Sequence, residues 1–323
     1  MTARTTRPLP SVGGTSRPSA RRRLVAVGAL AVAGSLLLTA CGDQTDSGGE
    51  GGGEPKAKTS EAPLFDKLPK DIQSAGVIKV GSDIAYAPIE FMNEDGEPDG
   101  IDPDLAEAMG KVLGVELKFE NGTFDQLVLG MNSGRYDVVM SAMTDTKERQ
   151  QGESKDAEGG ADFVNYFKAG SAILVKKGNP KNIETLDDLC GKKVAAQRGT
   201  ANETLVKEQD KKCDGGLDAF IADKDTDSIT QLQNGRADAV VTDFPVALYN
   251  ELNAGGGKLF EVVGDQIDAA PYGIAVNKKD TQLRDALKAA VQEIIDNGEY
   301  AKVLKKWKAE AGAIEEATVN AGK

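Results

Sequence analysis

Hydrophobic and polar positions follow two alternating periods from residue 77 onward. Short apolar or alternating runs, typical of strands, are separated by runs in which apolar residues recur every three or four positions, as is typical of helices. The first five elements are expected at 77–82 (strand), 102–114 (helix), 115–120 (strand), 123–134 (helix) and 136–140 (strand). This order predicts an α/β fold with a mostly parallel sheet and helices on its faces.

The segment 102–114 carries the signals of a complete amphipathic helix. Its main apolar residues are spaced to share one face: Leu105, Met109 and Leu113. Asp102 or Asp104 is expected to cap the first turn, and Gly114 is expected to end the helix.

Two more helices are expected at 281–298 and 299–310. Trp307, the only tryptophan, is expected to pack within the second of them. Residues 150–160 have no apolar period, and we therefore expect a surface loop there.

A partial internal repeat is the most useful long-range signal. Residues 129–145 resemble residues 229–243, since each stretch has a helix end, the pattern Gly-Arg-x-Asp and an apolar strand that stops at a polar turn. Residues 78–88 and 193–203 correspond in a similar way. The repeat predicts two α/β lobes with matching turns. The alternative is that Gly-Arg-x-Asp is only a common corner between a helix and a strand.

Four polar turns follow the expected strands, and we predict that they face one cleft. In open α/β sheets, ligands bind outside the carboxyl ends of the strands. The turns are Asp83–Tyr86, Ser141–Thr146, Gln197–Thr200 and the single residue Asp243.

The second of these turns carries groups that suit a zwitterion. Arg149 offers a rigid donor fork that matches a carboxylate, and the backbone N–H groups from Ala142 to Thr144 add donors. The carbonyl of Ser141 and the hydroxyl of Thr144 are acceptors for an ammonium group. The alternative for Arg149 is an exposed helix charge with partners one turn away.

Other candidates lie on the remaining turns. Asp243 offers a carboxylate to an ammonium group, and it also suits the N-cap of the helix that follows. Tyr86 and Phe124 are expected to hold a ligand side chain between them, although Phe124 equally suits a core position at a helix start. Asp83 is placed to meet a polar or cationic ligand tail.

Composition and charge narrow the chemistry. The 323 residues include no histidine, which excludes Ser-His and Cys-His nucleophile pairs and removes the commonest metal ligand. The first 40 residues hold six arginines and no acid, and the remainder has 33 basic and 51 acidic residues, a net charge of −18. Such a surface repels nucleic acid and anionic lipid headgroups.

Residues 1–40 have the basic, apolar and small-residue order of an export signal peptide, although a retained membrane anchor is the alternative. Both the general and the twin-arginine export routes stay open. The tetrad that ends at Cys41 resembles a bacterial lipobox, which implies cleavage before Cys41 and its acylation. Residues 41–65 are then a flexible linker, because 42–63 contain no Leu, Ile, Val or Phe.

The other two cysteines, Cys190 and Cys213, are an even pair in an exported chain, so a disulfide is expected. Two free buried thiols are the alternative.

From about Ile78 to Glu310 the chain resembles the polar amino-acid substrate-binding proteins of ABC importers, solute-binding protein family 3, in its lipoprotein form. Seven stretches carry the resemblance: VGSDIAYAPIEF, EDGEPDGIDPDLAEAMGKVLGV, FDQLVLGMNSGRYDVVMSAMTDTKER, FVNYFKAG, VAAQRGTANE, NGRADAVVTD and YGIAVNK. The resemblance implies a type II periplasmic-binding-protein fold, with two α/β lobes joined by two crossover strands. We expect lobe 1 at 66–168 and 268–315, lobe 2 at 169–267, and a C-terminal tail at 316–323.

The resemblance also implies roles for individual residues. Arg149, the backbone of Thr144 and the turn Thr200–Ala201 hold the α-carboxylate of an amino acid. Asp243, Thr144 and the carbonyl of Ser141 hold its α-ammonium group. The side chain lies between the aromatic residues Tyr86 and Phe124, and its tip faces Asp83 and Gln197.

The chain departs from the family pattern in four places. Ile89 replaces a frequent aromatic residue, Ala142 and Ala201 replace hydroxyl or glycine residues, and the loop 150–160 is longer than usual. These departures affect the expected side-chain preference more than the zwitterion site.

The expected function is a lipid-anchored binding component on the extracytoplasmic face of the bacterial cell membrane. Its partners are an ABC permease and a free polar amino acid, with basic and amide side chains among the candidates. We expect a monomer that binds no nucleic acid, metal or cofactor and catalyses no reaction. The alternatives are a dehydratase with the same fold and a sensor module that passes its ligand-bound state to a receptor.

Overall fold

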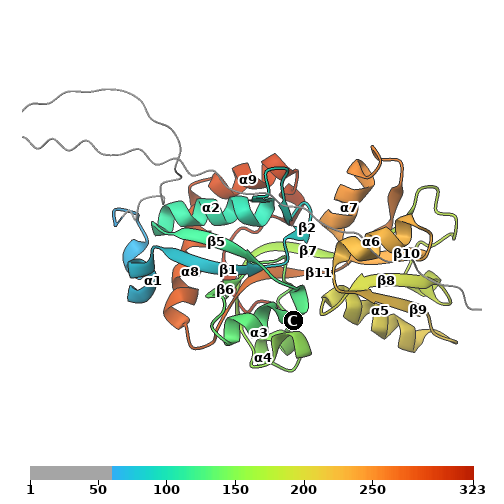
Figure 1. Ribbon diagram of the computed structural model, residues 1–323, viewed down its shortest axis with the longest axis horizontal. Coiled ribbons are helices and arrows are strands. Elements are labelled where there is room, and N and C mark those ends of the chain that lie inside the picture. Colours follow the sequence, from blue (N-terminus) through green and yellow to red (C-terminus); the bar gives the residue numbers. More distant parts are fainter. Residues whose placement is uncertain (1–59) are drawn as a thin grey trace, which may run out of the picture. The chain divides into compact units, whose positions relative to one another are not determined.

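The computed structural model describes residues 60–323 (Figure 1). The signal peptide expected at 1–40, the lipidation of Cys41 and most of the linker at 41–65 lie outside the described residues. Within the described range, no helix is long and apolar enough to cross a membrane.

Helices and strands alternate along most of the chain. The α-helices are α1 (Lys70–Ala75), α2 (Ile101–Leu113), α3 (Leu127–Asn132), α4 (Lys147–Gln151), α5 (Ala201–Lys212), α6 (Asp225–Gln233), α7 (Phe244–Asn253), α8 (Thr281–Asp296) and α9 (Glu299–Trp307). The strands are β1 (Val77–Ser82), β2 (Ala85–Tyr86), β3 (Glu90–Met92), β4 (Pro98–Asp99), β5 (Glu116–Asn121), β6 (Val138–Val139), β7 (Asp162–Lys176), β8 (Lys193–Gln197), β9 (Asp218–Ala222), β10 (Ala239–Asp243), β11 (Phe260–Val276) and β12 (Thr318–Val319). Short 3₁₀ helices include η2 (Phe124–Gln126) and η3 (Lys155–Ala157).

The main sheet has the order β5-β1-β6-β11-β7-β10-β8-β9, and β12 pairs with β7. Within each half the strands are parallel: β5 and β6 flank β1 on one side of the molecule, and β9 and β10 flank β8 on the other. The long strands β7 and β11 run antiparallel to each other and connect the two halves (Figure 1). The predicted fold is therefore confirmed: two α/β lobes joined by two crossover strands. The exact lobe boundaries remain predictions.

Alternating residues of the strands fill both faces of the sheet in lobe 2. Ile173 and Val175 of β7 lie in a cluster on the side of α5, whereas Ala172 and Leu174 lie in a cluster on the side of α6 and α7. Successive side chains of a strand point to opposite faces, which explains the continuous apolar runs in the sequence. Figure 1 shows α5 on one face of this sheet and α6 and α7 on the other.

The two Gly-Arg-x-Asp copies have the same structural role. The carboxylate of Asp137 accepts from the backbone N–H of Lys79 at 2.7 Å, and that of Asp238 accepts from the backbone N–H of Lys193 at 3.0 Å. Asp137 thus connects β6, which follows it, to the parallel strand β1, and Asp238 connects β10 to the parallel strand β8. The repeat reflects two equivalent lobes rather than a chance corner.

One local expectation was wrong. The N-cap of α2 is Gly100, and the carboxylate of Asp102 does not cap the helix but lies fully buried. The segment at 150–160 is mostly a surface loop as expected, but it also contains η3 and the completely buried Ala157. A single buried alanine gives no periodic signal in the sequence.

Trp307 packs against the core of lobe 1, as expected.

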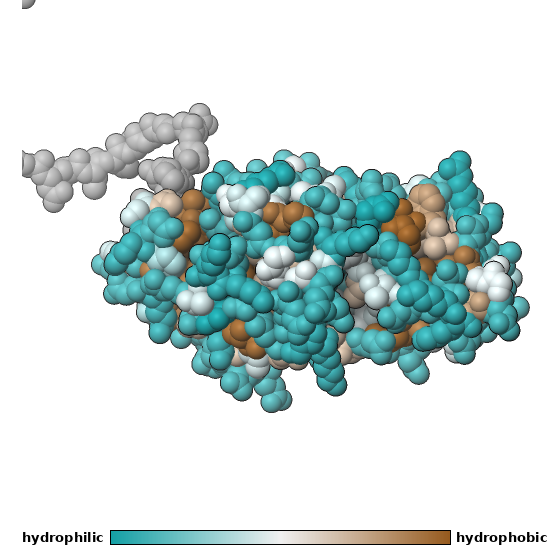
Figure 2. Space-filling model, turned by 90° about the horizontal axis from the view of Figure 1, so that it is seen from below, coloured by the Kyte–Doolittle hydropathy of each residue, from teal (hydrophilic) through white to brown (hydrophobic). Residues whose placement is uncertain are grey.

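The described part of the chain has a largely hydrophilic surface on the face seen in Figure 2, where apolar side chains appear in small, separate groups.

Candidate functional site

A polar cavity lies where the carboxyl ends of β1, β6, β8 and β10 meet. Its lining residues come from both lobes: Asp83, Tyr86, Glu90, Phe124, Ala142, Thr144, Arg149, Gln197, Thr200, Ala201, Asn202 and Asp243. All the ligand-site residues expected from the sequence are on this wall except Ser141, which lies directly behind it. Glu90 and Asn202 were not expected.

The cavity is small because the lobes touch each other around it. Its volume is about 10 Å³, which corresponds to roughly one water-sized space. Tyr86 of lobe 1 bonds through its hydroxyl to Thr242 and to the backbone N–H of Asp243 in lobe 2, each at 3.1 Å. A larger ligand can reach the cavity only when the lobes separate.

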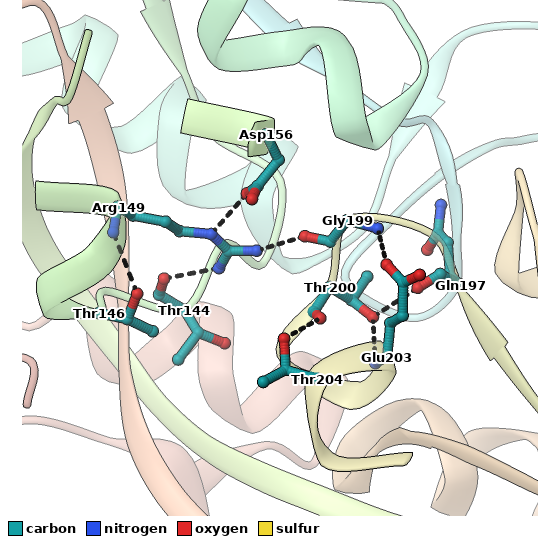
Figure 3. Close-up of polar contacts among 9 residues, drawn as sticks. All are labelled: Thr144, Thr146, Arg149, Asp156, Gln197, Gly199, Thr200, Glu203 and Thr204. Carbon is teal, nitrogen blue, oxygen red and sulfur yellow. Dashed lines mark hydrogen bonds and ion pairs between the residues drawn. The ribbon is translucent and has the colours of Figure 1, made fainter. Parts of the chain in front are cut away.

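Arg149 lies in α4, whose N-cap Thr146 accepts from the backbone N–H of Arg149 (Figure 3). Only 4% of the arginine is exposed, so the alternative of an exposed helix charge was wrong. Its guanidinium donates to Asp156 through Nε at 2.8 Å and to the carbonyls of Thr144 and Gly199 through the terminal nitrogens, both at 2.7 Å.

Guanidinium has five N–H groups, and these three bonds within residues 60–323 leave two for a ligand. The bond to Gly199 also connects the lobes, because Arg149 belongs to lobe 1 and Gly199 follows β8 in lobe 2. Arg149 further lies over the ring of Phe124, with the guanidinium carbon 5.5 Å from the ring centre. Phe124 belongs both to the core cluster of lobe 1 and to the cavity wall.

Asp243 occupies the N-cap position of α7, but its side chain makes no capping hydrogen bond in the described part of the chain. Its carboxylate instead accepts from Asn202 at 2.8 Å and from the Tyr272 hydroxyl at 2.5 Å. Burial raises the pKa of Asp243 above its ordinary value, although these hydrogen bonds act against the increase. Two neutral donors hold a carboxylate that would be stabilised further by a cation.

Asp83 and Gln197 form a second contact between the lobes. Nε2 of Gln197 donates to Oδ2 of Asp83 at 2.6 Å, whereas Oδ1 of Asp83 is buried without a hydrogen-bond partner among residues 60–323. Burial raises the pKa of Asp83 to about 6. This part of the cavity therefore favours a ligand group that donates hydrogen bonds or carries positive charge.

The turn after β6 rests on two buried acids. The hydroxyl of Ser141 donates to Glu90 at 2.7 Å and accepts from the backbone N–H of Asp83 at 3.0 Å. The backbone N–H of Ala142 donates to Asp102 at 3.3 Å, so this donor is used within the protein. Burial, and then the charge of Asp102, raises the pKa of Glu90 well above its usual range.

Ala142 has a φ of 46°, which is an unfavourable left-handed conformation for a residue with a Cβ atom. The bond to Asp102 helps to hold it, and through it the ligand-facing turn.

Thr200 begins α5. Its hydroxyl accepts from the backbone N–H of Glu203 at 3.0 Å and donates to the carbonyl of Gln197 at 2.7 Å, as Figure 3 shows. These bonds place Ala201 and Asn202 on the cavity wall at the N-terminus of a helix, where negative charge is stabilised.

The expected disulfide between Cys190 and Cys213 is present, with 5.3 Å between the Cα atoms, so the alternative of two free thiols was wrong. Neither cysteine lines the cavity.

Two α/β lobes with a polar cavity between them define a type II periplasmic binding protein. The chain belongs to the bacterial extracellular solute-binding proteins, family 3, whose sequence model matches residues 78–310.

Three known proteins are similar to the chain over most of its length. It is 30% identical over 308 residues to the arginine-binding protein ArgT of Corynebacterium glutamicum, which covers 94% of this chain and 97% of that protein. An ancestral arginine-binding protein bound to arginine has a TM-score of 0.65 and 39% identity, covering 72% of this chain and 98% of that structure. The ancestral amino-acid-binding protein AncCDT-1, a precursor of cyclohexadienyl dehydratase, has a TM-score of 0.64 and 34% identity, covering 74% and 98% respectively.

Proposed function

We propose that the protein is the extracytoplasmic binding component of an ABC importer and binds a free L-amino acid, preferably one with a basic side chain. The observation that carries this proposal is that Arg149 of lobe 1 and Asp243 of lobe 2 both line the same cavity. Among residues 60–323, two N–H groups of Arg149 have no hydrogen-bond partner, and the buried carboxylate of Asp243 accepts from the neutral side chains of Asn202 and Tyr272. Together they suit the two charges of an α-amino acid.

The preference for a basic side chain rests on Asp83. Its partnerless buried oxygen, within the part of the chain that the structure describes, suits the guanidinium or ammonium group of arginine or lysine. Tyr86 and Phe124 would flank the aliphatic part of that side chain. The names of the arginine-binding relatives support the same ligand class.

Binding would be coupled to closure of the lobes. A ligand that contacts Arg149 in lobe 1 and Asp243 in lobe 2 stabilises the closed state, because only that state offers both groups. The closed protein, held near the membrane by a lipid on Cys41 and acting as a monomer, would then deliver the amino acid to the permease.

A thermal-shift panel of the twenty amino acids, followed by calorimetry, tests the proposal. A ligand at 100 times its Kd stabilises the folded state by about 2.7 kcal/mol. We expect the largest shift with a basic amino acid, and we expect Arg149→Gln to abolish it. No shift with any amino acid, or an unchanged affinity in Arg149→Gln, would contradict the proposal.

A dehydratase is the rival candidate, because Glu90 lines the cavity with a raised pKa and a protonated carboxyl can act as a general acid. The similar ancestral protein AncCDT-1 is itself named an amino-acid-binding protein, and only the protein it preceded is a dehydratase. We propose that no turnover occurs, and an absorbance assay for an aromatic product tests this.

A further inference from the structure

The segment between α4 and β7 lies beside Arg149, which lines the cavity. Its helix η3 is anchored by Ala157, which lies fully buried in the core cluster that contains Phe124. The side-chain amide of Asn132 donates to the carbonyls of Glu158 at 2.9 Å and Gly160 at 3.3 Å. The segment therefore has a fixed place beside Arg149, even though it has no regular apolar pattern.

Asp156 of η3 is the ion-pair partner of Arg149. Oδ2 of Asp156 accepts from Nε of Arg149 at 2.8 Å, and the two side chains are only 11% and 4% exposed. Asp156 also lies against lobe 2, because a Cβ atom added at Gly199 would come within 3.4 Å of Cβ of Asp156. Figure 3 shows the carboxylate on the opposite side of the guanidinium from Thr144.

We propose that Asp156 is a positioning residue that orients the guanidinium of Arg149 toward the carboxylate of the ligand. This inference rests on the proposed function. A guanidinium is planar and its donors have fixed directions, so the bond at Nε, together with the bonds to Thr144 and Gly199, fixes the plane of the whole group. The remaining donors on the two terminal nitrogens then face Thr144, Gly199 and the cavity.

Two effects of Asp156 on ligand binding oppose each other. Its negative charge reduces the attraction of Arg149 for a carboxylate, whereas its hydrogen bond holds the guanidinium in one orientation. A side chain of four rotatable bonds loses much freedom when it is fixed, and a ligand that had to fix it would bind more weakly. We expect the orientation effect to be the stronger one.

Calorimetry with L-arginine and L-argininamide separates these effects. Asp156→Ala removes the acceptor, and we expect it to weaken binding of L-arginine at least tenfold while it weakens binding of argininamide, which lacks the carboxylate, less. Asp156→Asn keeps an acceptor oxygen without the charge, and we expect its affinity for L-arginine to stay within threefold of the original protein. Glu158→Ala is the matched control, since it removes an exposed acid from the same segment.

The outcomes distinguish this inference from the proposed function. If the unmodified protein binds L-arginine and Asp156→Ala binds it equally well, the positioning role is wrong and the proposed function stands. A tenfold loss in Asp156→Asn would show that the charge matters instead, and would also overturn the inference. If Asp156→Ala does not fold, Asp156→Leu, which fills a similar space but also removes the acceptor, takes its place under the same thresholds. If the unmodified protein binds no amino acid, both the proposed function and this inference fail.

Discussion

The carboxylate of Asp83 and the side-chain amide of Gln197 meet across the cavity, with 2.6 Å between Oδ2 and Nε2. Asp83 follows β1 and Gln197 ends β8, so the contact joins the two turns that the internal repeat pairs. The other oxygen of Asp83 has no hydrogen-bond partner in the described range. The neutral amide of Gln197 offsets only part of the cost of burying the Asp83 carboxylate. A cationic ligand group would form a charge pair with it.

We therefore expect Asp83→Asn to change the ligand preference. At pH 7.5 its affinity for L-arginine should fall at least tenfold, because a buried charge pair is lost, whereas its affinity for L-glutamine should change less than threefold. Calorimetry with both ligands measures this. Equal losses for the two would show that Asp83 supports the fold of the site rather than selecting charge.

Much of this architecture could be predicted from local patterns. The carboxyl ends of parallel strands lie at one edge of a sheet, so polar turns after apolar runs identified Arg149, Asp243 and Asp83 as neighbours. The repeated Gly-Arg-x-Asp pattern indicated two lobes, because each copy makes the same bond to a parallel strand.

Other parts of the site depend on tertiary contacts that have no local signal. Asp102 has the sequence pattern of a helix cap, yet it holds Ala142 from a distant element. Glu90 stands in a short apolar run, and its buried partner Ser141 lies 51 residues away. Asp156 lies in a segment without periodicity, so its bond to Arg149 could not be expected from the sequence.

The disulfide should stabilise the protein without affecting ligand binding. Cys190 and Cys213 are 23 positions apart, and closing a loop of this size contributes about 3 kcal/mol, mainly through the unfolded chain. The double variant Cys190→Ser, Cys213→Ser should lose about this free energy of unfolding and keep its affinity for L-arginine. Denaturant titration and calorimetry measure the two quantities, and a reductant should destabilise only the original protein. A large loss of affinity would place the disulfide in the ligand-binding mechanism.

Stability should decrease from pH 5 to pH 8. Burial raises the pKa of Asp102 and of Asp225 to about 7, whereas an unfolded chain has an Asp pKa of about 3.9. The folded state holds protons that the unfolded state has released, so this stabilisation is complete below about pH 4 and is lost as the pH rises through about 7.

Tm measured by calorimetry in the absence of ligand should therefore fall across this range. Asp225→Asn should give a flatter profile, because an amide does not titrate. Asp95→Asn, which removes an exposed acid, is the control for the loss of one negative charge. A Tm that rises from pH 5 to pH 8 would contradict the assignment of buried, protonated acids.

Closure of the lobes should depend on the absence of a side chain at Gly199. Its φ is 75°, and a Cβ atom there would lie 2.8 Å from Cβ and 3.0 Å from Cα of Asp125, which belongs to η2 in the opposite lobe. Such distances require the backbone to shift. Gly199→Ala should hold the lobes apart and weaken binding of L-arginine at least tenfold, since the closed state is the one that offers Arg149 and Asp243 together.

Gly178 provides the matched control for backbone strain. Its φ is 82°, and a Cβ atom there would meet nothing within 4 Å in the part of the chain that the structure describes. Both alanine variants should lose about 1–2 kcal/mol of stability, because each places a Cβ atom in a left-handed conformation. Only Gly199→Ala should also lose affinity and retain a larger radius of gyration in small-angle scattering with saturating ligand. Equal affinities in the two variants would mean that the turn at Gly199 does not limit closure, and that the lobes can bind the ligand without the contacts seen between them.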